Sequence, residues 1–241
     1  MKKVALSLAL SSVALFAGKN VVVADVPPVD VPTQKTIAND VSNGVALKLG
    51  TLGVGVDYEH FFTDKFALRG NINYFKYTKD KTIKDVPFHG KLTLFTAGIL
   101  ADYHPWASSF RVSGGVYYNG NKFSVTGKQT RNIKLGNTNY DAGSITLSGK
   151  IDFKKVAPYL GIGWSSTEVN GWHFTADIGV MYHGKPKVKL NGKLKSNYSG
   201  NNVYTQAQLD ADVKAKENEI YNKIKKYKFY PVISIGIEKK F

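Results

Sequence analysis

The residues that usually carry catalysis or bind metals are sparse and scattered in this chain. It has no cysteine, which excludes a disulfide, a thiolate metal site and a cysteine nucleophile. No two of its histidines have the local spacing of a metal site; they are His60, His89, His104, His173 and His183. The residues available for a Ser–His–carboxylate centre are His89, His183, Ser124 and Ser148. Because their spacing does not support a triad, we expect no catalytic residues, no metal and no cofactor.

Charged residues of both signs are instead set into segments that alternate apolar and polar residues. If such segments are barrel strands, the polar set faces the lumen. The expected lumen residues are Lys48, Asp57, Glu59, Arg69, Asp102, Arg111, Asp177 and Glu238. They form either a plug of ion pairs, since buried charges must be partnered, or a polar path for a small solute. The interior of an eight-stranded barrel is just wide enough for side chains, which favours the plug.

The alternation that positions these residues has a period of two from residue 40 to the end of the chain. At the C-terminus, for example, Phe229, Ile233 and Ile237 share one face and Ser234 and Glu238 share the other. This pattern predicts eight strands, at about 41–49, 52–62, 66–78, 91–104, 110–124, 149–164, 172–183 and 229–241. Most reach the length of about 9–11 residues that a tilted strand needs to cross a bilayer.

The N-terminus favours a membrane barrel over a soluble sandwich. Residues 1–24 have the basic start, apolar stretch and small residues of a secretory signal peptide, and residues 25–40 resemble an exposed periplasmic leader. The barrel is then expected over residues 41–241. Aromatic residues at the ends of apolar rows, such as Phe66 with Tyr74 and Trp172 with Tyr182, are typical of interfacial girdles.

Connections between the predicted strands alternate strictly between short and long. The long ones fall near 78–90, 120–150 and 184–227. Outer-membrane barrels have short periplasmic turns and long extracellular loops, which sets the orientation. An even strand number requires a tight hairpin at Gly50-Thr51, for which a type II′ turn is predicted. Residues 205–226 contain helix formers and no glycine or proline, and predict a helical insert before the last strand.

The formal net charge is +15, and its basic residues concentrate in the long connections. There they would face the phosphates of lipopolysaccharide. The expected contact residues are Lys79, Lys81, Lys84, Lys128, Arg131, Lys185, Lys187 and Lys189. Nucleic acid is the competing partner for such a charge, but the chain has no nucleic-acid-binding motif, and none is expected to bind.

Several segments resemble small proteobacterial outer-membrane barrels related to the CarO-type, carbapenem-resistance-associated channel family. They are KLGTLGVGVDYEHFFTDKFALRGNINY, AGILADYHPW, FRVSGGVYYNGNKF, VAPYLGIGW and KFYPVISIGIEKKF. The resemblance implies an eight-stranded barrel in the outer membrane and uptake of small solutes, basic amino acids among them. It also implies that the terminal Phe241 is a recognition signal for the barrel assembly machinery, although Lys239 departs from the usual aromatic.

These observations predict an all-β protein: an eight-stranded antiparallel transmembrane β-barrel with long extracellular loops and one helical insert. We expect a non-enzymatic protein of the outer membrane of a Gram-negative bacterium. Its function is either a narrow channel for small solutes or a closed-lumen structural or surface-interaction barrel. A lipid A-modifying barrel enzyme is the least favoured alternative.

Overall fold

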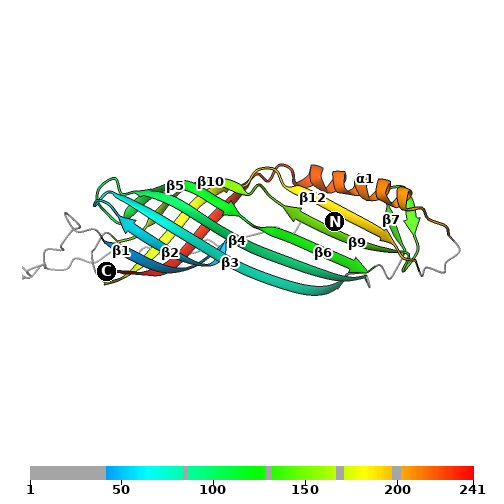
Figure 1. Cartoon of the computed structure of the whole chain (residues 1–241), viewed down its shortest axis with the longest axis horizontal. Coiled ribbons are helices and arrows are strands. Elements are labelled where there is room, and N and C mark those ends of the chain that lie inside the picture. Colours follow the sequence, from blue (N-terminus) through cyan, green and yellow to red (C-terminus); the bar gives the residue numbers. More distant parts are fainter. Residues whose placement is uncertain (1–41, 84–85, 129–131, 167–170, 197–201) are drawn as a thin grey trace, which may run out of the picture. The chain divides into compact units, whose positions relative to one another are not determined.

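Eight strands close into an antiparallel β-barrel, as the alternation predicted (Figure 1). The structure is a computed structural model that describes residues 42–83, 86–128, 132–166, 171–196 and 202–241; the predicted signal peptide and leader lie outside these ranges. The wall consists of β1 (Asn43–Gly50), β2 (Gly53–Phe61), β3 (Phe66–Ile83), β4 (Val86–Tyr103), β5 (Phe110–Asn119), β10 (Val156–Trp164), β11 (Gly171–Tyr182) and β13 (Phe229–Lys240). Pairing of β1 with β13 and of β4 with β5 closes the circle.

The outer wall of the barrel is apolar. Leu47, Ile72, Ile99, Leu160 and Ile235 are each about half exposed or more, while the residues between them along the strands point inward. Aromatic rings border this surface at both ends. Phe66 stacks on Tyr103 at the end where β1 begins and β13 ends, here called the terminal end, and Tyr182 packs on Phe229 at the opposite end. An apolar outer belt between two aromatic girdles is the surface that a bilayer requires.

The hairpin between β1 and β2 is as tight as predicted but lies one residue later. Gly50 pairs with Gly53, so Thr51 and Leu52 form the turn. The predicted type II′ turn is wrong, because that type needs a positive φ at its first central residue, and here the positive φ, of +107°, is at Gly53. A glycine at this position accepts that backbone conformation without a Cβ penalty.

At the end opposite the terminal end, β3 and β4 continue out of the barrel into an extension of the same sheet (Figure 1). There β4 pairs with β6 (Lys122–Lys128), β6 with β9 (Ile145–Asp152), and β9 with the edge strand β12 (Lys187–Leu194). The long connections thus carry strands of their own. The predicted strands 110–124 and 149–164 each divide in two, because one part pairs within the barrel and the other within this extension. We call the extension, with the elements packed on it, the platform.

Along β3 and β4, the apolar side chains change from the outer face to the inner face at one level. Within the barrel, Ile72 and Tyr74 face outward and Asn71 and Asn73 are buried inside. One step beyond Tyr74 the outward position is Lys76, while Phe75 and Tyr77 occupy the inner face. On β4, Phe95 is followed outward along the strand by Thr93 and Lys91, with Leu94 and Leu92 between them on the inner face. Tyr74 pairs with Phe95, so both strands invert together. Such an inversion is expected where strands leave hydrocarbon for water.

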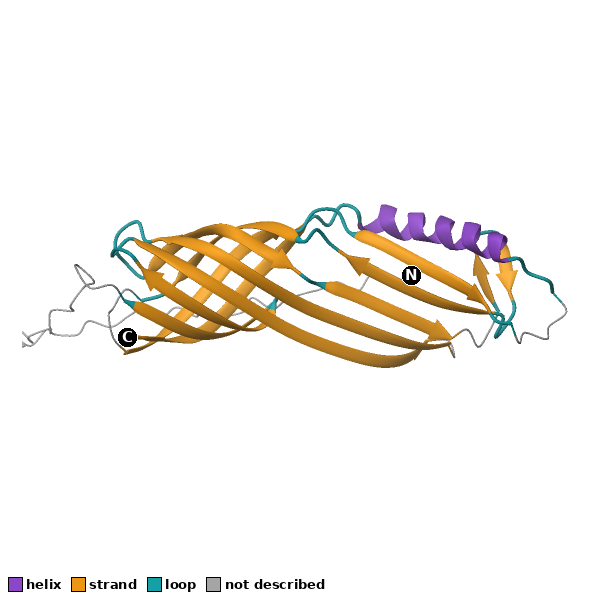
Figure 2. Cartoon of the chain, viewed as in Figure 1, coloured by secondary structure: helices purple, strands orange, loops and turns teal. Residues whose placement is uncertain are grey.

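The inner, apolar face of the platform is covered along β12 by helix α1 (Gln206–Ile224) (Figure 2). Leu209 and Val213 of the helix are buried and lie over Gly192, where an added Cβ would come within 2.9 Å of Val213. A short hairpin of β7 (Ile133–Leu135) and β8 (Thr138–Tyr140) adds Leu135 and Tyr140 to the same cluster. The platform therefore has a hydrophobic core separate from the barrel. No helix in the described part of the chain has the length and apolar character needed to span a bilayer.

Helix α1 also covers the unpaired edge of β12. The Leu190 amide donates to Glu217 at 2.9 Å, and Gln206 accepts from the Leu194 amide at 3.2 Å while donating to the Gly192 carbonyl at 3.0 Å. Hydrogen bonds from Lys214 and from the Leu190 amide lower the pKa of Glu217, so it remains an acceptor in mildly acidic conditions. Unpaired strand edges can pair with strands of other chains. Here Glu217 and Gln206 bond the free backbone groups of the β12 edge.

We predict that replacing the two capping side chains, Glu217→Ala with Gln206→Ala, opens the β12 edge. Each lost hydrogen bond is worth about 1 kcal/mol, so amide hydrogen exchange at Leu190 and Leu194 should accelerate by roughly fivefold. The matched control is Glu219→Ala, which removes a neighbouring helix carboxylate that bonds only exposed lysines among the contacts described. Unchanged exchange at Leu190 in the double variant would contradict the capping role.

Candidate functional site

The barrel lumen holds a connected cluster of charged side chains centred on Arg69. Its guanidinium donates to Asp102 at 2.7 and 3.0 Å, to Asp57 at 3.0 Å and to Asp177 at 3.1 Å. Ser113 accepts a further bond at 3.1 Å. Arg69 thus binds carboxylates from three other strands, including one across the lumen. Arginine suits this position because its planar group donates in several fixed directions and keeps its charge.

Asp177 connects Arg69 to the other two bases of the predicted lumen set. It accepts from Arg111 at 2.8 Å and from Lys48 at 2.6 Å. Lys48 also pairs with Asp57, and Arg111 approaches Glu59 at 3.5 Å. The structure therefore brings seven of the eight predicted lumen residues into one network, and all eight are 4% exposed or less.

Glu238, the eighth, lies toward the terminal end with a base that the sequence analysis did not select, Lys240. The Lys240 ammonium lies 3.6 Å from Glu59 and 4.0 Å from Glu238, and stacks over the Phe61 ring with its nitrogen 3.8 Å from the centroid. Ser165 donates to Glu238 at 2.6 Å. Lys240 could have been found from the sequence, because it continues the inward alternation two positions after Glu238. Phe61 and Lys240 are both fully buried and close the lumen at this end.

On the other side of the charged network the lumen is filled by apolar and aromatic side chains. Tyr117 and Tyr159 meet edge to face with centroids 5.5 Å apart, packed with Leu100, Met181 and Val232. Glycines opposite the rings make this packing possible. For example, a Cβ at Gly98 would come within 2.5 Å of Tyr117.

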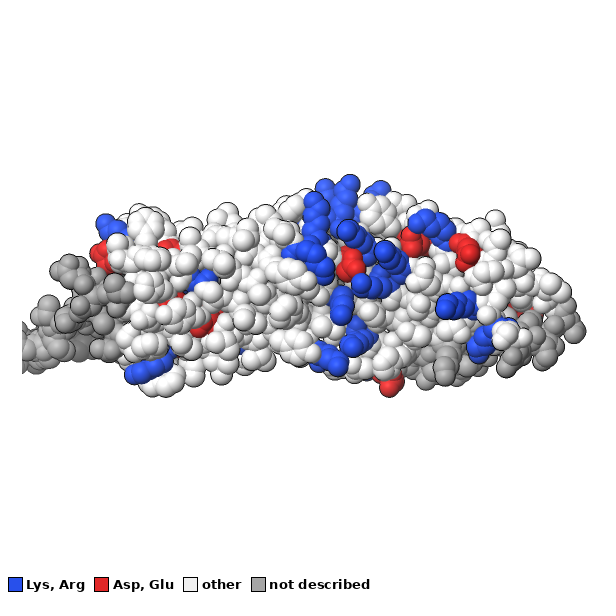
Figure 3. Space-filling view, in the orientation of Figure 1, with Lys and Arg blue, Asp and Glu red and all other residues white. Residues whose placement is uncertain are grey.

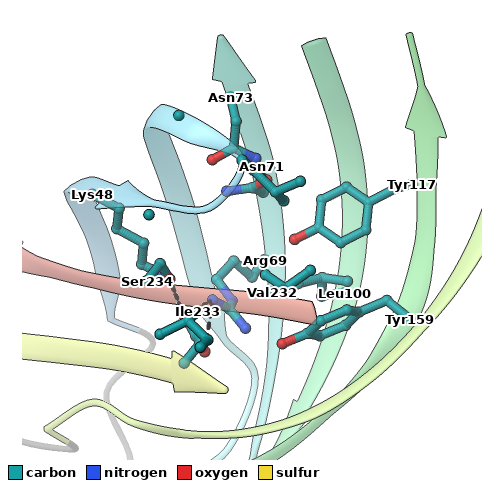
Figure 4. A pocket seen from close by; sticks show the side chains of 14 residues that line it. Lys48, Arg69, Asn71, Asn73, Leu100, Tyr117, Tyr159, Val232, Ile233 and Ser234 are labelled. Carbon is teal, nitrogen blue, oxygen red and sulfur yellow. Dashed lines mark hydrogen bonds and ion pairs between the residues drawn. The ribbon is translucent and has the colours of Figure 1, made fainter. Parts of the chain in front are cut away.

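A cavity of about 20 Å³ remains between the network and the tyrosines (Figure 4). In Figure 4, Arg69, Tyr117 and Tyr159 lie around this space, with Asn71 and Asn73 on the same strand as Arg69. A cavity of roughly 10–15 Å³ on this measure accommodates one water molecule. The cavity is therefore large enough for a water molecule and too small for an amino acid.

The histidines do not come together. His89 binds Asp80 on the platform, whereas His183 packs against Phe153 with centroids 4.1 Å apart. Among the described residues no group of three or more His, Cys, Asp or Glu side chains is arranged to hold a metal ion.

The predicted basic contact residues occupy different surfaces. Lys84 and Arg131 lie outside the described residues, as do the side chains of Lys81 and Lys128. Lys79 shares the inner face of the platform with Phe75 and Tyr77, and Lys185 is exposed just before β12. Lys187 and Lys189 lie on the outward face of β12. Strand pairing places them in two rows of residues that the sequence alone does not bring together.

The first of these rows crosses five strands and comprises Lys76, Thr93, Lys122, Asp152 and Lys187. The second lies one step farther from the barrel and comprises Thr78, Lys91, Ser124, Lys150 and Lys189. All ten residues face the same side, because directly paired residues share a face and each strand alternates. Figure 3 shows Lys and Arg gathered in a band where the barrel continues into the platform. We call these two sets the lysine rows.

The last residue, Phe241, is exposed at the terminal end, and its backbone exchanges two hydrogen bonds of 3.0 Å with Asn43. The outward row of β13 that precedes it includes Phe229, Ile233, Ile235 and Ile237. The amphipathic C-terminal strand that was expected to bear an assembly signal is thus present.

Comparison with solved structures supports the resemblance suggested by the sequence. The CarO2 protein of Acinetobacter baumannii has a TM-score of 0.53 and 21% identity, over 84% of this chain and 100% of that one. A. baumannii CarO has a TM-score of 0.52 and 22% identity, over 82% of this chain and 97% of that one. At this identity the similarity confirms the fold alone, that of a CarO-like eight-stranded β-barrel. No protein-family model and no curated protein sequence matches the chain.

We predict that Arg69→Met strongly destabilises the barrel, because it leaves three buried carboxylates with one base fewer. Removing one partner of a buried ion pair costs about 3–5 kcal/mol. The free energy of unfolding, measured by urea titration of the refolded protein in detergent, should fall by that amount.

The control for this prediction is Lys76→Met, which removes an equal charge from an exposed outward position on the same strand. Equal stability of the Arg69 and Lys76 variants would show that the ion pairs of Arg69 do not hold the lumen together.

Proposed function

We propose that this protein is an integral barrel of the Gram-negative outer membrane whose lumen is sealed, and that its function is exerted by the platform outside the membrane. The observation that carries the proposal is the filled lumen. Charged side chains paired with one another occupy one half, a tyrosine layer occupies the other, and the space between is about 20 Å³. A barrel built in this way anchors a domain in the membrane.

The orientation follows from the two ends of the barrel. The terminal end has the short turns at 62–65 and 104–109, whereas the platform lies at the other end. Outer-membrane barrels keep short turns in the periplasm and extended connections outside the cell. In this orientation the platform projects from the cell surface among lipopolysaccharide molecules, and the β13 strand with Phe241 is available to the assembly machinery in the periplasm.

A narrow channel for basic amino acids is the competing function. A solute on that path would have to displace Tyr117 and Tyr159 and then separate Arg69 from its carboxylates. Each broken buried pair costs several kcal/mol, so passage at useful rates would require a rearranged lumen. The sealed barrel needs no such rearrangement, and we therefore favour it.

We predict that the refolded protein produces no unitary current in planar bilayers and does not increase the swelling of liposomes in isotonic lysine, arginine or glycine. A general porin in the same lipids is the positive control. The protein must first be shown to be inserted, by its recovery in carbonate-washed membranes. Stepwise currents from the inserted wild-type protein, or solute-dependent swelling, would contradict the sealed lumen.

A further inference from the structure

We infer that the lysine rows bind the phosphate groups of lipopolysaccharide molecules adjacent to the barrel. This inference rests on the proposed location and orientation of the protein. It identifies lipid phosphates as the ligand of the outward face of the platform. The rows place six lysines on the outward face: Lys76, Lys91, Lys122, Lys150, Lys187 and Lys189.

The height of the rows fits the phosphate layer of the outer leaflet. The Tyr74–Phe95 pair marks the level at which the outer face changes from apolar to polar, and the first row begins one step beyond it. Two residues along a strand advance about 7 Å. At a strand tilt of about 40°, the rows therefore lie about 5 and 10 Å outside the hydrocarbon boundary. The headgroup layer on one side of a bilayer is about 5–8 Å thick.

The direction of the lysines also fits a lipid partner. They continue the outer wall of the barrel, the surface that faces neighbouring lipids, whereas the opposite face of the platform is apolar and is partly covered by α1.

The rows carry an uncompensated positive charge. The one acid among their ten residues is Asp152, which lies 2.9 Å from Lys150 and is flanked in the register by Lys122 and Lys187. The next row out, which includes Asp80, His89 and Asn191, has no lysine. The row beyond it carries Lys193. The lysines are therefore most concentrated in the two rows nearest the barrel, as expected for binding to a layer of phosphates.

Lysines elsewhere on the platform provide a contrast. On α1, Lys216 and Lys223 bind Glu219 at 2.7 and 2.5 Å. Their hydrogen bonds lower the pKa of Glu219 to about 2, so this pairing persists across physiological pH. These lysines are neutralised within the protein, unlike most of those in the rows, and they serve as controls.

The test uses the full chain inserted into phosphatidylcholine nanodiscs, with purified lipid A as the probe. Native mass spectrometry measures binding of bis-phosphorylated lipid A and of the same lipid with both phosphates removed. Charge attraction near a membrane surface is worth about 1 kcal/mol per lysine. We expect the wild type to prefer the phosphorylated lipid by about tenfold or more, corresponding to at least two such contacts.

Three variants, each with four substitutions, are compared with the wild type. The face variant K122Q/K150Q/K187Q/K189Q should lose the preference, and the arginine version K122R/K150R/K187R/K189R should keep it. The control K79Q/K214Q/K216Q/K223Q removes the same charge elsewhere and should also keep it. Equal binding of both lipids by the wild type, or equal loss in the face and control variants, would overturn the inference.

The outcome also separates this inference from the proposed function. If the protein inserts and does not conduct but binds both lipids equally, phosphate binding by the lysine rows is contradicted, whereas the proposed sealed barrel is not. A wild-type chain that does not insert into membranes contradicts both.

Discussion

Nine Asp, Glu, Lys and Arg side chains, four basic and five acidic, are buried among the described residues of a barrel that has only eight strands. Because these side chains are buried, each needs a partner of opposite charge or a hydrogen-bonding group within the lumen. The strands of the wall must hold these partners in place. Arg69 shows how this is achieved, because it binds Asp57, Asp102 and Asp177 from three other strands. The near balance of charge and the multidentate geometry of arginine make the polar interior stable. The same pairing fills space inside the barrel, and this is the observation on which the proposed sealed lumen rests.

The second constraint is the change of solvent along β3 and β4. Both strands are 18 residues long, more than a bilayer crossing requires, and their alternation inverts where the outer aromatic girdle ends. Beyond that level the inner face is apolar and needs a cover. Helix α1 covers the part of it along β12, where Leu209 and Val213 pack over Gly192 and Glu217 accepts a hydrogen bond from the strand edge. The platform is therefore a small sheet-and-helix unit supported by two barrel strands.

Much of this architecture could be predicted from the sequence, because alternation in a strand is a local property. The period of two located the barrel strands and the inward positions that the structure buries. The absence of glycine and proline located the helix, which the structure bounds at Gln206–Ile224. Lys240 follows the same alternation, two positions after Glu238, so its buried position is also encoded locally. The platform could not be foreseen in the same way. Residues 120–150 are polar and glycine-containing, and their strands are stabilised by pairing with distant segments. Lys76, Lys122 and Lys187 are neighbours only through the register of five strands, which no local pattern encodes.

The central claim is that the lipid boundary crosses β3 at Tyr74. It can be measured directly, since the chain has no cysteine and each outward position of β3 can receive a single spin label. Labels replacing Leu68, Ile72, Tyr74, Lys76 and Thr78 in the membrane-inserted protein are compared by their collision rates with oxygen and with a water-soluble nickel complex. The account predicts that oxygen collisions dominate at 68 and 72, that the two rates cross near 74, and that nickel collisions dominate at 76 and 78. Lipid exposure that continues through 78, or water exposure at 68 and 72, would contradict it.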